Sequence, residues 1–554
     1  MTSLAPGAQS QAQSTDQPVS RVQTAAFIIA LSLIGVILLT LILFILKLNN
    51  GTFLYTMDDP YITLAISDQI SHGNYGVNAG LHAAPSSSIL FAFLIAAAAR
   101  FPIHPYFPLI VNCLALFVTM WIVWRFFRHL RLAGDAFGWV VQAIALVLLA
   151  VCLNLIAVVF CGAEHSLHIA ATAACIYGLA LLLDKAEMHA WLPIVIILAP
   201  LLRYEGLPLS IAALLILALR GYWRTAIGAF MFIVFLLGSF SAFLLSMHLP
   251  PISSSILVKS DVAANGVSGA AIGFLQSVGW NVLLMAIHPV GLVVLAIGVA
   301  AAVQCYRELP EKPWRWSSHG LMALGLVCLI GGHAAGGRFG GLDRYEDYVL
   351  LGTAMMGIYL SQDAIRNVLA NKKIRLIICC ATALALMVLC FRYIRSTWLV
   401  PLESNNIYEQ QFQMHRFVND FYKAPVAVND LGLVSYHNPN FVLDLGGLAS
   451  EEARHLRFSK ASAEAYRTFI ASHGVHLVII YDEWFIGQIP ASWVKVASME
   501  LSRERISPDK KEVQFYATDV FTAVQLQPEL QSFKKSLPPR VKLTIYNYAV
   551  SASR

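Results

Sequence analysis

A long succession of apolar segments constrains the fold of this chain more than any other feature. From residue 27 to residue 393 the sequence consists of apolar runs separated by short polar breaks. A helix needs about 20 apolar residues to cross the hydrocarbon core of a bilayer. Only 13% of all residues are charged, whereas soluble domains carry roughly 25%. The sequence therefore predicts a polytopic α-helical membrane protein.

The apolar runs predict about eleven transmembrane helices. Residues 1–24 are predicted to form a disordered tail. The first span has no small-residue cleavage site after it, so we expect it to remain as an uncleaved membrane anchor. Residues 88–99 are apolar but too short to cross, and we expect a half-helix at one membrane face. The predicted spans begin near Ala25, Tyr106, Phe137, Glu164, Ala190, Gly206, Thr225, Asn281, Ser318, Tyr345 and Arg375.

The distribution of Lys and Arg predicts the orientation of these spans, because short cytoplasmic loops are enriched in cations. The predicted first outer loop, residues 48–105, holds Arg100 as its only Lys or Arg. An odd number of spans places the segment after residue 395 outside, opposite a cytoplasmic N-terminal tail. The cations then assigned to the inside are Arg21, Arg125, Arg128, Arg131, Lys185, Arg220, Arg224, Arg307, Lys312, Arg315, Arg366, Lys372, Lys373 and Arg375.

The last part of the chain has a different composition. Residues 25–395 form the predicted transmembrane domain, and charged residues return at ordinary density in residues 396–554, which predict an extracytoplasmic α/β domain. Its Asn429-Asp430 and 444–447 segments are turn sequences first of all, with acceptor binding as the alternative. Short strands are expected at 426–428, 441–443, 476–480 and 512–516, and a helix at 461–472.

With this topology, the polar residues at the span ends gather on the outer face. Ionisable groups at membrane depth are costly and usually functional, whereas the alternative is that each is an ordinary charge that reaches the interface. Five separate loops contribute to the one face, which favours a functional site. The residues are Asp58, Asp59, Glu164, His165, Arg203, Glu205, Lys259, Arg338, Arg344, Tyr345, Glu346 and Asp347.

The first outer loop contains the most informative pattern. Asp59 is predicted to cap an amphipathic helix that begins at Pro60, carries an apolar stripe and lies on the membrane surface. Asp58 then lies just before the helix, where a carboxylate is well placed to act as a general base toward a hydroxyl from the aqueous side. The alternative is that Asp-Asp-Pro is only a helix start. We predict Asp58, rather than Asp59, as the base.

Several of these motifs resemble one family when taken in order. Asp58-Asp59-Pro60-Tyr61-Ile62-Thr63-Leu64, followed by residues 72–78, resembles the first outer loop of GT-C glycosyltransferases, in particular bacterial arabinofuranosyltransferase-like and mannosyltransferase-like members. The chain departs from the family at Pro60, at Tyr204 and at Glu346-Asp347. Further similar segments are Cys161-Gly162-Ala163-Glu164, Leu202-Arg203-Tyr204-Glu205-Gly206, Pro250-Pro251 with Val258-Lys259, Arg344-Tyr345, Asn429-Asp430-Leu431-Gly432 and Val442-Leu443-Asp444-Leu445-Gly446-Gly447-Leu448.

The resemblance implies an inverting glycosyltransferase of the inner (plasma) membrane that uses a polyprenyl-phosphate sugar as donor. The acceptor would be a hydroxyl of an envelope glycan or lipid at the outer face. It implies catalytic roles for Asp58 and Asp59, and cations aimed at the leaving phosphate would stabilise the transition state. The candidate cations are Arg203, Lys259, Arg338 and Arg344, with Glu164, Glu205 and Tyr345 in support.

No cofactor or nucleic-acid partner is predicted, and no metal is assigned, although Asp58-Asp59 could supply carboxylates to a divalent ion. The sequence shows no glycine-rich nucleotide loop, in agreement with a lipid-linked donor, and two adjacent carboxylates such as Asp58-Asp59 rarely complete a metal site alone. A transporter or channel is one alternative, but the chain shows no inverted repeat and its polar residues cluster at one face, not at mid-membrane. A non-catalytic membrane scaffold with an outer domain is the other alternative.

Overall fold

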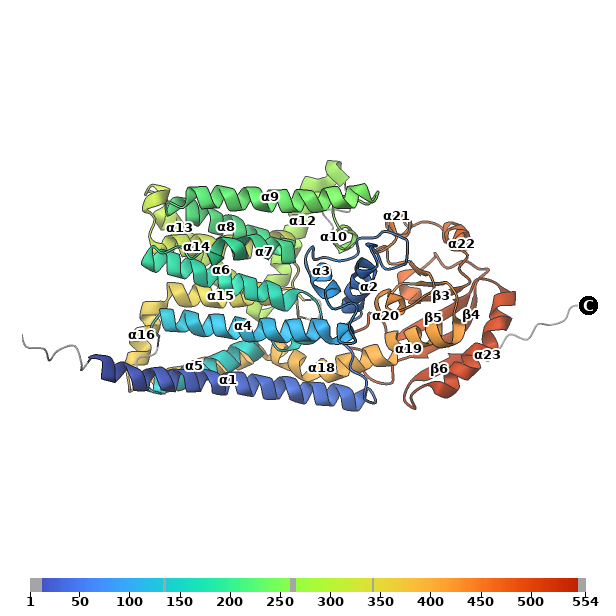
Figure 1. The fold of residues 1–554 in the computed structure, drawn as a ribbon, viewed down its shortest axis with the longest axis horizontal. Coiled ribbons are helices and arrows are strands. Elements are labelled where there is room, and N and C mark those ends of the chain that lie inside the picture. Colours follow the sequence, from blue (N-terminus) through green and yellow to red (C-terminus); the bar gives the residue numbers. More distant parts are fainter. Residues whose placement is uncertain (1–11, 133–135, 260–265, 341–342, 547–554) are drawn as a thin grey trace, which may run out of the picture.

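The computed structural model describes residues 12–132, 136–259, 266–340 and 343–546. Its long helices lie side by side in a bundle, and a mixed α/β domain is attached to one end of that bundle (Figure 1). The described helices of the bundle are α1 (Ala12–Leu48), α4 (Phe107–His129), α5 (Ala136–Cys152), α6 (His165–Lys185), α7 (Trp191–Leu202), α8 (Leu207–Leu219), α9 (Trp223–Ser246), α12 (Gly266–Ile287), α13 (Pro289–Glu308), α14 (Ser318–Gly336), α15 (Asp347–Leu360), α16 (Gln362–Ala370), α17 (Arg375–Leu389) and α18 (Phe391–Glu409).

The helices make the chain a multi-pass membrane protein. Within the described ranges, seven helices are long and apolar enough to span a bilayer, or eight if the pair Arg375–Leu389 and Phe391–Tyr422, bent by 61°, is one span. The predicted count of about eleven is therefore not confirmed. The spans predicted near Ala190, Gly206 and Tyr345 correspond to the shorter apolar helices α7, α8 and α15.

One predicted span is two helices in the structure. Instead of a single helix from Asn281, α12 ends at Ile287 and α13 begins at Pro289, with His288 in an extended conformation between them. Proline disfavours a helical conformation in the residue before it and cannot donate a hydrogen bond to the preceding turn. The chain therefore breaks the helix at His288.

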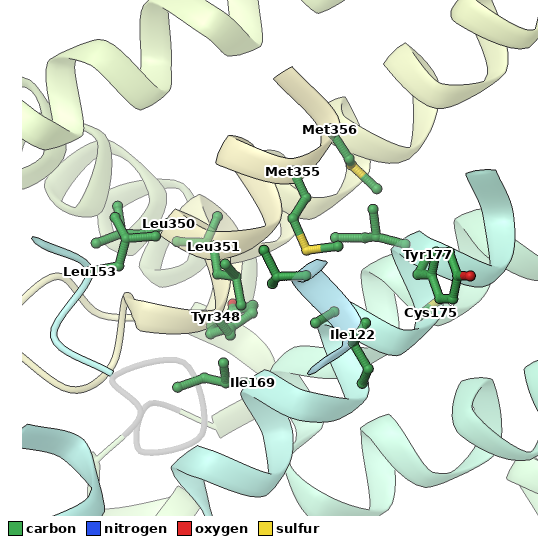
Figure 2. Packing of buried hydrophobic residues seen from close by; sticks show 14 of the residues in the cluster. Ile122, Leu153, Ile169, Cys175, Tyr177, Tyr348, Leu350, Leu351, Met355 and Met356 are labelled. Carbon is green, nitrogen blue, oxygen red and sulfur yellow. The ribbon is translucent and has the colours of Figure 1, made fainter. Parts of the chain in front are cut away.

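The bundle is held together by interdigitated apolar side chains. Leu351, Met355 and Met356 of α15 and Ile169 and Cys175 of α6 are among the packed side chains in Figure 2, and all five are buried in the same cluster. Each fully buried side chain of this size contributes roughly 1.5–3 kcal/mol in water, but lipid tails are as apolar as leucine. Within a bilayer, close packing therefore drives helix association instead.

The loops at the far end of the bundle, away from the α/β domain, are joined by hydrogen bonds to main-chain carbonyls. Arg366 Nε donates to the carbonyl of Leu130 at 3.0 Å, and Arg220 Nη2 donates to that of Trp316 at 3.2 Å. The Ser318 hydroxyl donates to the Leu183 carbonyl at 2.8 Å. These contacts involve five cation-bearing segments, which lie at the end of the bundle opposite the α/β domain.

Cysteine labelling tests which side of the membrane each end faces. In a cysteine-free background, we expect Ser459→Cys, on the exposed surface of the α/β domain, to react with an impermeant thiol reagent in intact cells. Asn371→Cys, exposed in the loop before α17, should react only after permeabilisation. The reverse pattern would place the α/β domain in the cytoplasm and invert the predicted orientation.

The first outer loop contains two short helices, α2 (Asp59–Ser71) and α3 (Phe91–Ala96), the second inside the predicted half-helix. The predicted cap at Asp59 is wrong: Asp59 is the first helical residue and Asp58 takes the N-cap position. The predicted surface location of α2 is also wrong. Residues 60–67 are all buried, because α2 packs between α3 and the short helix α20 (Gly432–Ser435) of the α/β domain.

The α/β domain is built on a six-stranded mixed sheet of order β2-β1-β3-β5-β4-β6. β1 pairs in parallel with β2 and β3, and the other neighbours are antiparallel. The four predicted strands and the predicted helix are present. The strands are β1 (Val426–Val428), β2 (Val442–Asp444), β3 (Leu477–Ile480), β4 (Val494–Glu500), β5 (Glu512–Ala517) and β6 (Lys542–Ile545), with α21 (Glu451–Phe458), α22 (Ala463–Ser472) and α23 (Val520–Ser536).

Candidate active site

A polar cavity of about 50 Å³ lies where the bundle, the first outer loop and the α/β domain meet. Its walls come from segments that are far apart in the sequence. Each segment contributes residues from the end of a helix or from a loop. The lining residues are Asp59, Ile62, Thr63, Pro85, Ser86, Ser87, Ala163, Glu164, His165, Arg203, Ser255, Arg344, Tyr345 and Leu448.

Arg203 is locked in place by two carboxylates. It follows the last residue of α7 in an extended conformation (φ −152°, ψ 138°), which turns its side chain out of the helix. Nη1 donates to Glu164 at 2.6 Å and Nη2 donates to Glu205 at 2.6 Å. Glu164 also accepts a bond from the Ser87 hydroxyl at 2.9 Å. Because both terminal nitrogens are engaged and the side chain is only 8% exposed, Arg203 acts as a strut between the loops.

Arg344 pairs with one carboxylate, whereas Arg203 pairs with two. Its Nη2 donates to Asp59 at 2.9 Å and to the Tyr345 hydroxyl at 2.9 Å. Its Nη1 meets the thioether of Met57, a weak acceptor. Its buried Nε has no hydrogen-bond partner among the described residues. Burial lowers the pKa of Arg344, but Tyr345 and Asp59 together raise it above the ordinary value, so the group stays cationic.

Tyr345 connects the two arginines. The Arg344 guanidinium carbon lies 4.8 Å from the centroid of the Tyr345 ring, and that of Arg203 lies 5.7 Å from it. The His165 ring meets the Tyr345 ring edge-on at 5.8 Å. A cation within about 6 Å of an aromatic ring is attracted to its face. The Tyr345 ring therefore fixes the positions of two positive charges that would otherwise repel each other.

The adjacent carboxylates of the first outer loop have different surroundings. Of the two, Asp59 lines the cavity and its side chain is 40% exposed. Asp58 turns toward the α/β domain and accepts the backbone N–H groups of Gly432 at 2.6 Å and Leu433 at 2.8 Å. Burial and the nearby Asp430 carboxylate raise the pKa of Asp58 well above its ordinary value.

The other predicted site residues are distributed as follows. Glu164, Arg203, Arg344 and Tyr345 are brought together as predicted, and Glu205 joins them through Arg203. Arg338 is exposed and lies outside the cavity lining. Lys259 is the last residue of α10 (Ser254–Lys259), and its side chain falls outside the described part of the chain.

Sequence patterns did not predict part of the lining. Ser86, Ser87 and Ser255 bring hydroxyls to the cavity, and the two serine-bearing loops are tied together because Ser254 N–H donates to the Ala84 carbonyl at 2.9 Å. Leu448 reaches the cavity from the α/β domain. The serines belong to two runs of three, residues 86–88 and 253–255, and such polar runs between apolar segments could have indicated the cavity, whereas Leu448 has no comparable signal.

Each carboxylate around the cavity has a hydrogen-bond or ion-pair partner from the protein. Asp58 accepts two backbone N–H groups, Asp59 pairs with Arg344, and Glu164 and Glu205 pair with Arg203. The described residues contain no group of three or more His, Cys, Asp or Glu side chains that could hold a metal.

Fold and site together define a multi-pass helical membrane protein with a terminal α/β domain and a charged cavity between them. Residues 405–516 match the family model described as a domain of unknown function, DUF8728, which covers well under half of the chain. No curated protein matches the sequence.

Solved structures with a limited likeness come from Archaeoglobus fulgidus. One is the archaeal oligosaccharyltransferase AglB in complex with an inhibitory peptide and a dolichol-phosphate, at 11% identity and a TM-score of 0.43, covering 88% of this chain and 74% of that one. Another is the oligosaccharyltransferase with Zn and sulfate, at 10% identity and a TM-score of 0.41, covering 92% and 74%. At TM-scores below 0.5, the role of the cavity has to follow from its own residues.

Proposed function

We propose that the chain is an inverting glycosyltransferase that moves a sugar from a polyprenyl-phosphate donor to a hydroxyl of an envelope glycan or lipid. The observation that carries this proposal is the pairing of Asp59 with Arg344 inside a cavity at the end of a membrane bundle. A carboxylate and a cation side by side supply the two groups that such a transfer needs, a base for the acceptor and a counter-charge for the leaving phosphate.

Arg344 is the donor-phosphate group in this proposal. Its Nη1 faces only the thioether of Met57, a weak acceptor, so a phosphate oxygen would replace that contact most readily. The fork geometry matches two oxygens of a phosphate, which a lysine cannot match. Arg203 has both terminal nitrogens bound to carboxylates and keeps a positioning role.

Asp59 is the base. It takes the proton of the acceptor hydroxyl while the acceptor oxygen forms a bond to the anomeric carbon from the face opposite the phosphate. The bond between that carbon and the phosphate oxygen breaks, and its electron pair leaves with the polyprenyl phosphate.

The motif order supports the substrate class. The segments that resemble the arabinofuranosyltransferase-like and mannosyltransferase-like enzymes include those that build the cavity: residues 58–64, 161–164, 202–206 and 344–345. A pentose or hexose on a polyprenyl phosphate is therefore the proposed donor. The orientation predicted from the loop cations puts the reaction on the outer face of the plasma membrane.

Transfer assays in membranes test the proposal. Membranes that carry the protein are supplied with polyprenyl-phosphoryl arabinofuranose or polyprenyl-phosphoryl mannose, and the release of polyprenyl phosphate is measured. We expect release from one of the two donors above the level of membranes without the protein. A scaffold or a transporter would leave both donors intact, so the absence of release from either donor would contradict the proposal.

A further inference from the structure

The first outer loop is bound to the α/β domain by a carboxylate clamp. Both oxygens of Asp58 accept backbone N–H groups, from Gly432 at 2.6 Å and from Leu433 at 2.8 Å, across more than 370 positions of sequence. Asp59, the next residue, lines the cavity. The position of Asp59 is therefore tied to the docking of the α/β domain.

A second residue of the same loop extends the sheet. The Asn78 side-chain amide donates to the carbonyl of Val442 at 2.9 Å, and its oxygen accepts from the Val442 N–H at 2.9 Å. β2 stands at the end of the strand order, so its outer edge presents backbone groups that need partners. The Asn78 amide supplies one such partner and fixes the edge of the sheet to the loop.

The turn after β2 leads directly to the cavity. Asp444 accepts the backbone N–H groups of Gly446 at 2.7 Å and Ala449 at 2.6 Å, which closes the turn around Leu448. Gly447 adopts φ +83°, and a Cβ there would lie 2.7 Å from the Arg454 Cα, so the turn needs glycine. Leu448 is the contribution of this turn to the cavity lining. Asn78 binds strand β2, and the turn that follows β2 places Leu448 at the cavity.

We propose that the α/β domain is a working part of the active site, and that Asp58 and Asn78 are positioning residues that dock it. Docking places two groups at once, the base Asp59 on one side of the cavity and Leu448 on the other. This assigns a role to the segment that matches only a domain of unknown function, since Gly432, Val442 and Leu448 all lie within residues 405–516. The catalytic consequence rests on the proposed glycosyl transfer, whereas the docking itself does not.

Two substitutions loosen the clamp from opposite sides. Asp58→Asn replaces one acceptor oxygen with an NH₂ group that cannot accept a backbone N–H. Gly432→Ala leaves Asp58 unchanged, but its Cβ would lie 2.1 Å from the Asp58 carbonyl oxygen and 2.7 Å from its Cγ. Asp482→Asn is the matched control, because the Asp482 side chain contacts Lys495 and Tyr516 of the same domain, at 3.3 and 2.8 Å, and neither partner belongs to the first outer loop.

Hydrogen exchange and turnover are measured on the full-length protein in nanodiscs. In Asp58→Asn and Gly432→Ala we expect amide exchange in residues 431–436 to rise at least tenfold, since the lost acceptor protects Gly432 and Leu433. The rate of polyprenyl-phosphate release should fall roughly 10–100-fold, because a shift of about 1 Å in a catalytic group has an effect of this size. KM for the donor should stay within about twofold. Asp482→Asn should change neither exchange nor turnover.

The outcomes separate the docking role from the proposed function. Asp59→Asn should lower turnover by about 10²–10⁴-fold and leave exchange in residues 431–436 at the wild-type rate. Faster exchange with full turnover in both clamp variants would overturn the active-site role of the domain. Unchanged exchange in both variants would overturn the docking role itself. If wild-type protein releases no polyprenyl phosphate, the transfer reaction fails as a proposal, while the exchange data still decide whether Asp58 docks the domain.

Discussion

Replacing Asp59 with Asn should lower the rate of sugar transfer by about 10²–10⁴-fold, or roughly 3–5.5 kcal/mol of activation barrier. Asparagine has the size and polarity of aspartate but cannot accept the acceptor proton. Asp59 lines the cavity and pairs with Arg344 at 2.9 Å, so the loss falls on the group that faces the substrate. The measurement is polyprenyl-phosphate release at equal abundance of the folded protein.

Asp58→Asn is the internal comparison for this prediction. Asp58 faces Gly432 and Leu433, so its amide variant should lose docking and show the smaller decrease of roughly 10–100-fold. The base was assigned to Asp58 from sequence, and the geometry favours Asp59 instead. An inactive Asp58→Asn protein beside an Asp59→Asn protein at full rate would restore the sequence-based assignment.

Composition and helix-end chemistry predicted the framework of the molecule. Apolar runs long enough to cross a bilayer predicted the helical bundle. The polar triplet Arg203-Tyr204-Glu205 between two apolar runs predicted the break between α7 and α8. Helix ends on one side of a membrane lie in a common plane, which explains why Glu164, Arg203, Arg344 and Asp59 could be placed together without any pairwise contact information.

The roles of the two aspartates and the partners of the two arginines depend on tertiary contacts, which the sequence alone does not reveal. Two neighbouring aspartates differ only in what lies opposite them, and the partner of Asp58 is a backbone turn more than 370 residues away. The hydrogen-bond partners of each arginine could not be predicted from the sequence either. Arg203 is bound by two carboxylates, whereas the Nε of Arg344 has no partner among the described residues. Strands β4 and β6 mix charged and apolar residues, and α23 contains Pro528, so their local patterns were weak.

Replacing Arg344 with Ala should lower kcat/KM for the donor by at least tenfold, and by about 100-fold if two bonds to phosphate are lost. Each charge-assisted hydrogen bond contributes roughly 1.5–3 kcal/mol. Arg344→Lys keeps the charge but not the planar fork, so it should recover only part of the activity. The measurement is the concentration dependence of polyprenyl-phosphate release on donor and on acceptor, because a phosphate contact weakens donor use more than acceptor use.

Arg203→Ala separates phosphate binding from structural support. Its removal leaves Glu164, with a side chain only 4% exposed, without its cation, and breaking a buried pair in this way typically costs about 3–5 kcal/mol of stability. We therefore expect Arg203→Ala to lower the thermal stability of the purified protein strongly. Arg344→Ala should lower it less, since its partner Asp59 is 40% exposed and can be solvated. If Arg344→Ala instead loses stability like Arg203→Ala and the remaining folded protein uses the donor normally, Arg344 is a strut and the leaving phosphate must be met by another group.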